Sequence, residues 1–375
     1  MPSDTPQLST VNSQPSASCS RADHRSTLAI CSDLDETPDA ETYFELMRFL
    51  NTTEETSMGQ GVGLEVGNSI YFDMAPGQFS YWNASEEDRE KIRTLIRSGH
   101  IDCLHSFGDL ATTRAHAARA LEELERHDCR LKVWVDHAQA ATNFGSDIMR
   151  GHGDDSDHPA YHADLTVAYG IKYVWRGRVT SVIGQDVKAN LAGIGRWRHP
   201  FASARTLGKE AAKQVFGRLG NRKYAFHSKN KLVAEGTLRD GNVVQEFLRC
   251  SPHWSGISGR DRGDAIHEVL SRSFLDRLLR RRGHSILYTH LGKLEGGRYP
   301  RRLSPAAVNA FRLLADYVKR GEILVTTTAR LLELSRSARE NRNGSDPSVP
   351  GVYTPSENSN SPAQPWSPLK FPALE

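Results

Sequence analysis

Two aspartates, Asp33 and Asp35, directly follow the first apolar run of the chain, residues 27–32. An extended backbone turns residues i and i+2 to the same face, so the two carboxylates should share one pocket. Like charges held this close repel each other unless a cation or a proton intervenes, so one carboxylate could bind a metal while the other acts as a base. Alternatively, both could simply cap the helix that follows.

Other side chains that can do chemistry stand where later apolar runs end: His105, Asp136, His137, Arg176, Arg178 and His290. Ligands of parallel α/β folds bind at the carboxyl ends of the strands, so we expect these side chains to share a site with the two aspartates. A mixed set of oxygen and imidazole ligands suits zinc, and also manganese, cobalt or iron. The two arginines could orient Asp33 or bind a substrate group, or they could be salt-bridge partners.

The elements that must position these residues alternate between apolar runs and amphipathic helical patterns, which is typical of a parallel α/β sheet or barrel. Helix boundaries follow capping preferences: Ser85 should begin a helix that Gly99 ends, and Ser304 one that Gly321 ends. We predict seven strands, at 27–32, within 62–72, and at 101–104, 131–135, 171–175, 285–288 and 323–325. Seven strands suggest a distorted (β/α) barrel.

The barrel domain is predicted to cover residues 26–337. Residues of about 185–260 interrupt the alternation with short runs separated by Asn and Gly, and we expect a β-rich insertion of hairpins on the barrel rim. Residues 1–25 and 338–375 are rich in Ser, Pro and Asn and are expected to be disordered.

Composition narrows the possible partners and compartment. A net charge of +3 over 375 residues gives no reason to expect nucleic-acid binding. The basic run Arg280-Arg281-Arg282 is expected to close a helix, where cations suit the dipole, rather than to contact a polyanion. We find no run long enough to span a membrane and no signal peptide at the start, so a cytoplasmic location is expected. The five cysteines form no C-x-x-C pair and are expected to be reduced.

Several segments resemble the polysaccharide deacetylases of the NodB type. Strand-Asp33-Leu34-Asp35 resembles the first motif of that family, and His105-Ser106-Phe107-Gly108-Asp109 resembles its His-Ser/Thr-x-x-His motif. Tyr288-Thr289-His290 is similar to the late strand that delivers a catalytic histidine, and residues 323–327 to the closing segment. The resemblance covers about residues 27–336 without the insertion. It implies a metal-dependent hydrolase that removes an acetyl or other N- or O-acyl group from a small or polymeric saccharide.

The resemblance also implies a role for each residue: Asp33 as general base, Asp35 and His105 as metal ligands, and His290 as general acid. Asp109 stands where the family has its second metal histidine. The third ligand would therefore be Asp109 itself or His137 from the next strand.

Two other functions are compatible with the sequence. Asp33-x-Asp35-x-Thr37 is similar to the opening motif of the haloacid-dehalogenase-like phosphatases, in which Asp33 would be the nucleophile and Asp154-Asp155 could help bind magnesium. The Gly- and Asp-rich segment 151–158 could instead be a solvated loop or an active-site lid. Because Asp109 departs from the family pattern, a saccharide-binding barrel without catalysis is the third possibility.

Overall fold

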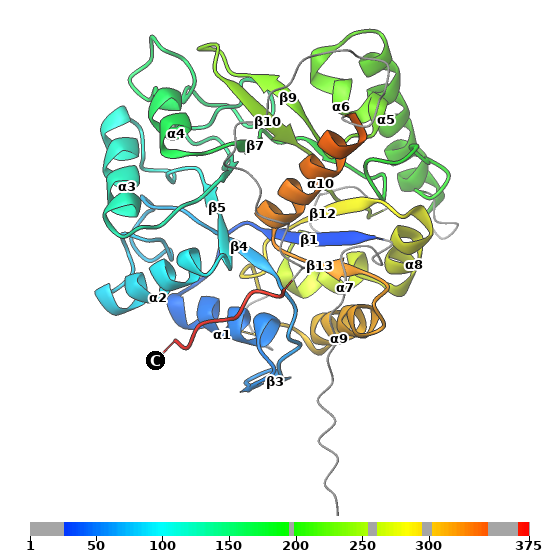
Figure 1. The fold of residues 1–375 in the computed structure, drawn as a ribbon, viewed down its shortest axis with the longest axis horizontal. Helices are drawn as coiled ribbons and strands as arrows, with labels where there is room; N and C mark the ends of the chain where they lie inside the picture. The colour runs from blue at the N-terminus through cyan, green and yellow to red at the C-terminus, as the bar shows by residue number, and fades with distance from the viewer. Residues whose placement is uncertain (1–25, 195–198, 254–260, 295–301, 344–366, 375) are drawn as a thin grey trace, which may run out of the picture.

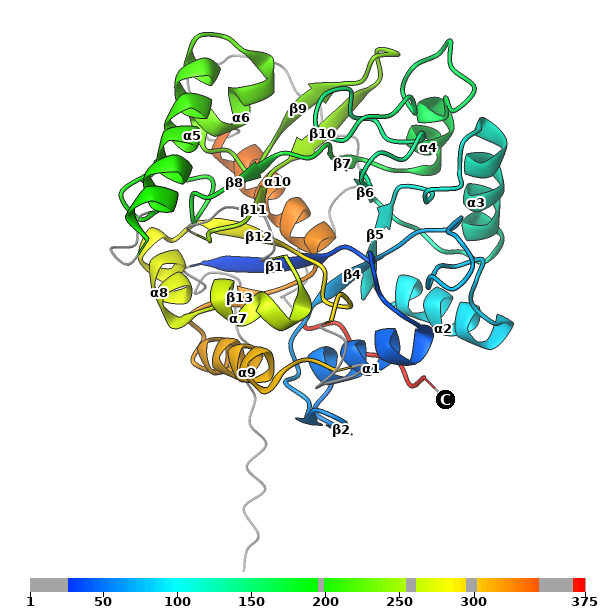
Figure 2. The ribbon, with the colours of Figure 1, turned by 180° about the vertical axis from the view of Figure 1, so that it is seen from behind.

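The computed structural model describes residues 26–194, 199–253, 261–294, 302–343 and 367–374. It has a mixed α/β fold in which helices surround a curled, mainly parallel sheet (Figures 1 and 2). The helices are α1 (Ala40–Asn51), α2 (Glu86–Arg97), α3 (Arg114–Arg126), α4 (Ala163–Tyr169), α5 (Pro200–Arg218), η1 (Arg222–Tyr224), α6 (Ala225–Lys229), η2 (Gly263–Ala265), α7 (Ile266–Val269), α8 (Arg272–Arg281), α9 (Pro305–Lys319) and α10 (Thr328–Asn343). None of these helices is both long and apolar enough to cross a membrane. The prediction for residues 1–25 lies outside the described residues.

Six parallel strands form the continuous part of the sheet. Their spatial order is β12 (His284–Thr289), β1 (Thr27–Ser32), β4 (Gly67–Ile70), β5 (Ile101–His105), β6 (Val133–Val135) and β7 (Tyr173–Trp175). Each lies within or next to a predicted strand. Because all six run in the same direction, their carboxyl ends meet at one edge and bring together side chains that are far apart in the sequence. A separate hairpin pairs β2 (Glu55–Thr56) with β3 (Gly59–Gln60).

The segment that contacts both edges of this curled sheet comes from the predicted insertion. Strand β10 (Val243–Phe247) pairs in parallel with β7, and β11 (Arg249–Cys250) pairs with β12 after a single intervening residue. Strand β9 (Val233–Thr237) pairs antiparallel with β10, and β8 (Val179–Thr180) pairs with β11. The rim-insertion prediction is therefore wrong for this part of the chain. The predicted last strand, β13 (Leu324–Val325), pairs only with the amino end of β1.

The β-hairpin prediction is confirmed for β9 and β10, which pair antiparallel, but it is wrong for residues 200–218 and 222–229, which are helical. Residues 223–226 lie in η1 and α6, beside the long helix α5. Helix α5 turns a polar face inward, where the Glu210 carboxylate accepts hydrogen bonds from the Thr180 hydroxyl (3.0 Å) and the Ser181 N–H (3.2 Å). Its outer face carries Phe201, which is 91% exposed. The usual amphipathic pattern is thus inverted in α5.

Helix α10 closes the amino-end side of the sheet interior. Leu331 and Leu332 pack among inward-facing strand residues such as Val133 and Ile286. The first turn of α10 is fixed by Asp102, whose carboxylate accepts a hydrogen bond from the Ala329 N–H (2.7 Å). Figure 1 shows α10 running across the sheet near its centre. With the amino-end side filled, the carboxyl-end edge remains to carry a site.

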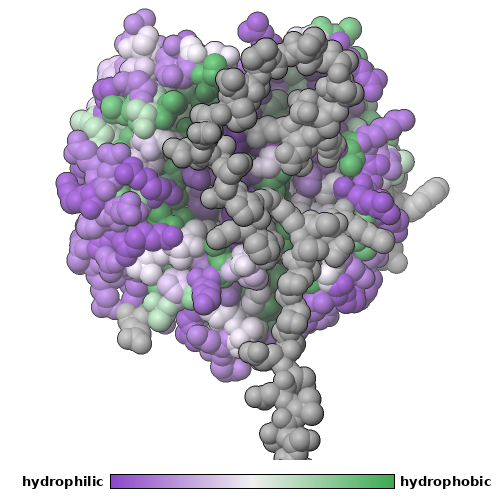
Figure 3. All heavy atoms as spheres, in the orientation of Figure 1, coloured by the Kyte–Doolittle hydropathy of each residue, from purple (hydrophilic) through white to green (hydrophobic). Residues whose placement is uncertain are grey.

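Part of the predicted disordered tail is ordered. Residues 338–343 continue α10, and residues 367–374 pack against the body of the protein. The Leu369 N–H donates to Glu65 (3.1 Å), and the Phe371 ring meets His100 edge to face (5.0 Å between centroids). The tail was misassigned because its docking depends on a few apolar residues without helical or strand periodicity. Elsewhere, hydrophilic side chains cover much of the margin of the face in Figure 3.

Candidate metal centre

Asp33 and Asp35 lie just past the carboxyl end of β1. The Asp33 N–H still donates to the carbonyl of Thr289 (2.8 Å), so the backbone is extended there, and the two carboxylates do face a common site. Asp33 is almost fully buried, whereas 21% of the Asp35 side chain is exposed. The capping alternative fails, because Asp39 accepts the hydrogen bond from the first turn of α1 (Thr42 N–H, 2.8 Å).

Three imidazoles converge on the Asp35 carboxylate, each through its Nε2 atom. His290 Nε2 lies 3.1 Å and His105 Nε2 3.8 Å from Asp35 Oδ2, and His137 Nε2 contacts Asp35 Oδ1. They come from the ends of β12, β5 and β6, as the sequence predicted. The Tyr71 ring, which follows β4, stacks on both His105 and His137 and fixes their planes. These residues therefore form one buried cluster with a partly exposed carboxylate in its middle.

Arg249 holds Asp33 from inside the sheet, and the sequence analysis missed it. Its Nη1 donates to Asp33 Oδ2 at 2.7 Å, and its guanidinium lies 4.0 Å from the centroid of Trp175. Arg249 is completely buried, while Asp33 Oδ1 has no hydrogen-bond partner among the described residues. The pair therefore occupies one oxygen of Asp33 and leaves the other available. The sequence feature that could have indicated Arg249 is a single charged residue within the apolar run 247–250.

His290 is held in the same way by a second residue that the sequence did not indicate. Its Nδ1 lies 3.3 Å from the Asp261 carboxylate, while Nε2 faces Asp35. Burial opposes a charged imidazole, but hydrogen bonds to Asp261 and Asp35 and the charge of Asp33 raise the pKa of His290 to about 10. His290 therefore carries a proton at neutral pH in the metal-free protein.

The other members of the cluster titrate differently. Burial would raise the pKa of Asp35, but the surrounding imidazoles, His105 foremost, bring it well below its usual value. Burial lowers the pKa of His105 to about 4 despite the two carboxylates, so this ring is neutral at pH 7. Burial also disfavours charge on His137, yet its hydrogen bond to Asp35 raises the pKa. A neutral imidazole next to a carboxylate is a donor set that suits a transition metal.

Asp109 lies behind His137 and does not face Asp35 directly. Its carboxylate is 3.4 Å from His137 Nδ1, and its side chain is 52% exposed. Asp136 is fully buried and accepts hydrogen bonds from the Trp134 indole (2.8 Å) and the Phe144 N–H (2.9 Å), which organises the loop after β6. His137 thus belongs to the cluster and Asp109 lies next to His137. Asp136 instead stabilises the loop that follows β6.

The two predicted substrate-binding arginines are engaged in ion pairs. Arg176 donates to Glu246 at 2.6 Å, and Arg178 donates to Asp147 at 3.0 Å and lies 3.5 Å from Glu246. Arg178 is nearly buried by these contacts. They correspond to the salt-bridge alternative, and among the described residues no contact joins either arginine to the Asp35 cluster.

The acidic segment 151–158 lies apart from the cluster. Asp154 is completely buried and binds Arg239, whose Nε lies 2.8 Å from Asp154 Oδ1. Asp155 pairs with His152, whose ring stacks on that of His158 at 3.9 Å. No contact links Asp154 or Asp155 to Asp33 among the described residues, so they do not form an acidic site with it.

The donor atoms fit a divalent metal. Ligand atoms of Asp33, Asp35 and His290 lie within 4.8 Å of one another, and this is the one such group of three in the described ranges. His105 and His137 extend the ring of donors around Asp35. Asp35 contacts all three imidazoles, while Asp33 Oδ2 lies 3.8 Å from His105 Nε2 and 4.0 Å from His290 Nε2. Unpartnered buried donors and acceptors, such as Asp33 Oδ1, also indicate that the cluster is incomplete without a further group.

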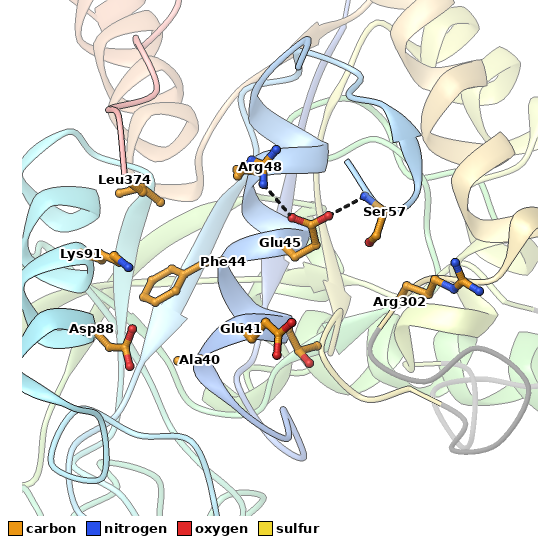
Figure 4. A pocket seen from close by; sticks show the side chains of 11 residues that line it. Ala40, Glu41, Phe44, Glu45, Arg48, Ser57, Asp88, Lys91, Arg302 and Leu374 are labelled. Atoms are coloured by element: carbon orange, nitrogen blue, oxygen red, sulfur yellow. Dashed lines mark hydrogen bonds and ion pairs between the residues drawn. The ribbon is translucent and has the colours of Figure 1, made fainter. Parts of the chain in front are cut away.

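A separate pocket on the surface is a less suitable site than the Asp35 cluster. A pocket of about 740 Å³ lies along the outer side of α1 and includes Phe44, Lys91 and Leu374 (Figure 4). Its Glu45 is already paired with Arg48 and with the Ser57 N–H, and none of the cluster residues lines it. The Asp35 cluster is therefore the better candidate site.

No protein-family model matches this chain, and no curated protein sequence matches it. Among solved structures, a 4-alpha-glucanotransferase from Thermococcus litoralis aligns with 83% of this chain at 12% identity and a TM-score of 0.37. The chain spans 40% of the length of that protein. A TM-score this low does not establish a shared fold.

Proposed function

We propose that this protein is a metal-dependent hydrolase that removes an N- or O-acyl group from a saccharide, as the polysaccharide deacetylases of the NodB type do. The observation that carries the proposal is the arrangement around Asp35: three imidazoles, and an adjacent carboxylate, Asp33, held by a buried guanidinium. A seven-stranded barrel of the NodB type would accommodate this arrangement, with the segment 243–250 as the strand between β7 and β12.

In this proposal the metal is held by Asp35, His105 and His137. His105 is neutral at pH 7, and a metal would displace the proton that the contact with Asp35 favours on His137. His290 is held on its Nδ1 side by Asp261 and is left for proton transfer. Asp109 would act on the far side of His137, where a carboxylate orients a ligating imidazole and raises its basicity. Zinc suits two imidazoles and one carboxylate, and manganese, cobalt or iron could also bind.

The remaining residues would carry the proton transfers. The bound metal would supply Lewis acidity toward the acyl carbonyl. Asp33, through its free Oδ1, would accept the proton of the attacking water, while Arg249 holds the other oxygen in place. His290 would donate the proton on Nε2 to the leaving nitrogen or oxygen, with Asp261 holding the opposite side of the ring. Water and the acylated sugar give the free acid and the free amine or alcohol.

Metal analysis and acyl release test the proposal together. Asp33→Asn should keep the metal but lose release of acetate from acetylated oligosaccharides, because the base is gone. Asp35→Asn should lose the metal itself. Full metal content in Asp35→Asn, or undiminished turnover in Asp33→Asn, would contradict the proposal.

The same variants separate the other two functions. A phosphatase would form an aspartyl-phosphate at Asp33, which beryllium fluoride would mimic in a magnesium-dependent way. The burial of Asp33 and its pairing with Arg249 favour the hydrolase, because such a carboxylate is poorly placed to attack a phosphate. Saccharide binding and metal binding without acyl release would indicate the non-catalytic barrel.

A further inference from the structure

A second polar pocket lies far from the Asp35 cluster, at the end of α8. It encloses about 420 Å³ and is lined by Arg277, Arg280 and Arg281 on one side and by residues 190–194 on the other. Helix α8 leads into the amino end of β12, whereas His290 follows the carboxyl end of that strand. A six-residue strand is about 20 Å long, so the two sites are separate. Figure 2 shows α8 on the flank of the molecule, below α5.

The charge in this pocket is unbalanced. Three of its lining residues are arginines, and none of the described lining residues is acidic. Among nearby acidic side chains, Glu210 accepts from the Ser181 N–H and is already paired with Lys213 at 2.7 Å. Glu268 lines the adjoining pocket together with Arg277 and lies 3.3 Å from His253. Guanidinium groups that line one pocket repel one another, so an anion bound among them would stabilise the arrangement.

Arg281 gives the most direct indication of a ligand. Its Nε and Nη2 atoms are buried, and neither has a hydrogen-bond partner among the described residues. These two atoms form the edge of the guanidinium that binds carboxylate, phosphate or sulfate oxygens in bidentate fashion. A buried donor pair without an acceptor is costly, and an oxyanion supplies both missing acceptors. Arg277 is fixed beside it by donation to the Gly193 carbonyl.

The helix end alone does not account for this cluster. Cations near a helix C-terminus interact with about half a negative charge, and that interaction does not require the side chains to converge. The last turn of α8 is already capped, because the Arg282 N–H donates to the carbonyls of Leu278 and Leu279. The helix end also supplies no acceptor for the buried Nε and Nη2 atoms of Arg281, so the pocket remains attractive to anions.

We propose that this pocket is an oxyanion-binding site that takes a phosphate or sulfate group, either free or as the ester of a small organic molecule. Apolar wall residues Ile183 and Ile194 suit the carbon part of such an ester. The site is independent of the proposed hydrolase chemistry, since it shares no residue with the Asp35 cluster.

The experiment uses the full chain without added metal and follows its melting temperature with inorganic phosphate, with sulfate, and with chloride at equal ionic strength. Phosphate or sulfate should raise the melting temperature more than chloride does. The double variant Arg280→Gln/Arg281→Gln should weaken the binding of phosphate by about tenfold or more, because it removes the charge-assisted hydrogen bonds.

The control is Arg272→Gln, which makes the same type of substitution and removes one positive charge from the exposed first turn of α8. It should leave phosphate affinity within about twofold of the wild type, since exposed charges contribute little. Equal stabilisation by phosphate and chloride would overturn the proposal, and so would equal affinity in the double variant and the wild type. Comparing phosphate with a sugar phosphate then distinguishes a free anion from an ester.

Discussion

The buried pair of Arg249 and Asp33 offers the sharpest test of how this site is held together. Both side chains are at most 2% exposed, and Arg249 Nη1 lies 2.7 Å from Asp33 Oδ2. Replacing Arg249 by Met keeps an apolar side chain against Trp175 but leaves the Asp33 charge buried and unpaired. Breaking such a pair from one side costs about 3–5 kcal/mol. We expect Arg249→Met to lower the free energy of unfolding by that amount.

The partner substitution shows whether the unpaired charge is the cause. In Arg249→Met/Asp33→Asn no charge is left unpaired, so much of the lost stability should return. The unfolding free energies of the wild type, both single variants and the double variant, measured with guanidinium chloride on metal-free protein, form a double-mutant cycle. We expect the two residues to be coupled by about 2 kcal/mol or more.

An exposed pair provides the comparison. Arg114 binds Asp164 through two hydrogen bonds of 2.6 and 2.7 Å, yet both side chains are more than 40% exposed. The same cycle with Arg114→Gln and Asp164→Asn should give less than about 1 kcal/mol. If the costs of Arg249→Met and Asp33→Asn simply add within about 0.5 kcal/mol, the burial argument is refuted.

Three further predictions concern other parts of the chain. Burial raises the pKa of Asp102 to about 7, so its contribution to stability is largest below about pH 4 and is lost as pH rises toward 7. Asp102→Asn should therefore reduce the loss of unfolding free energy over this pH range, by at most about 4 kcal/mol, as measured by denaturant titrations at each pH. A chain ending at residue 343 loses the contacts of Phe371, so its free energy of unfolding should be about 2 kcal/mol lower. An unchanged free energy of unfolding would mean that the docked tail does not stabilise the fold. Asp109→Asn should weaken zinc binding about 10- to 100-fold and His137→Ala considerably more, as measured by competition with a chelator; equal effects would place Asp109 among the ligands.

Much of the site could be predicted because its residues follow strongly apolar strands. The run 27–32 became β1 with the same bounds, and this alone places Asp33 and Asp35 at the carboxyl edge. His105 and His290 follow from the same rule on two other strands. Parallel pairing then brings together residues more than 250 positions apart, as Asp35 and His290 are.

The parts that could not be predicted depend on long-range packing. Arg249 meets Asp33 from 216 positions away, and its strand is too short and too mixed to be assigned from periodicity. Asp261 has no local pattern that distinguishes it from a surface aspartate. Helix α5 escaped detection because its polar side chains, such as Glu210, face inward, so the apolar periodicity that indicates a helix points to the wrong side.

The charges around the cluster explain why Asp109 need not be a ligand. Asp33 is neutralised by Arg249, and the protonated ring of His290 is neutralised by Asp261, so both pairs have little net charge. Asp35 is the carboxylate that the three imidazoles contact, and a divalent cation bound there would keep an excess positive charge. The Asp109 carboxylate, next to His137 Nδ1, would reduce that excess positive charge by way of the imidazole ring, without itself binding the metal. In the proposed site Asp109 would therefore act on the metal through His137, and His137 would be the ligand.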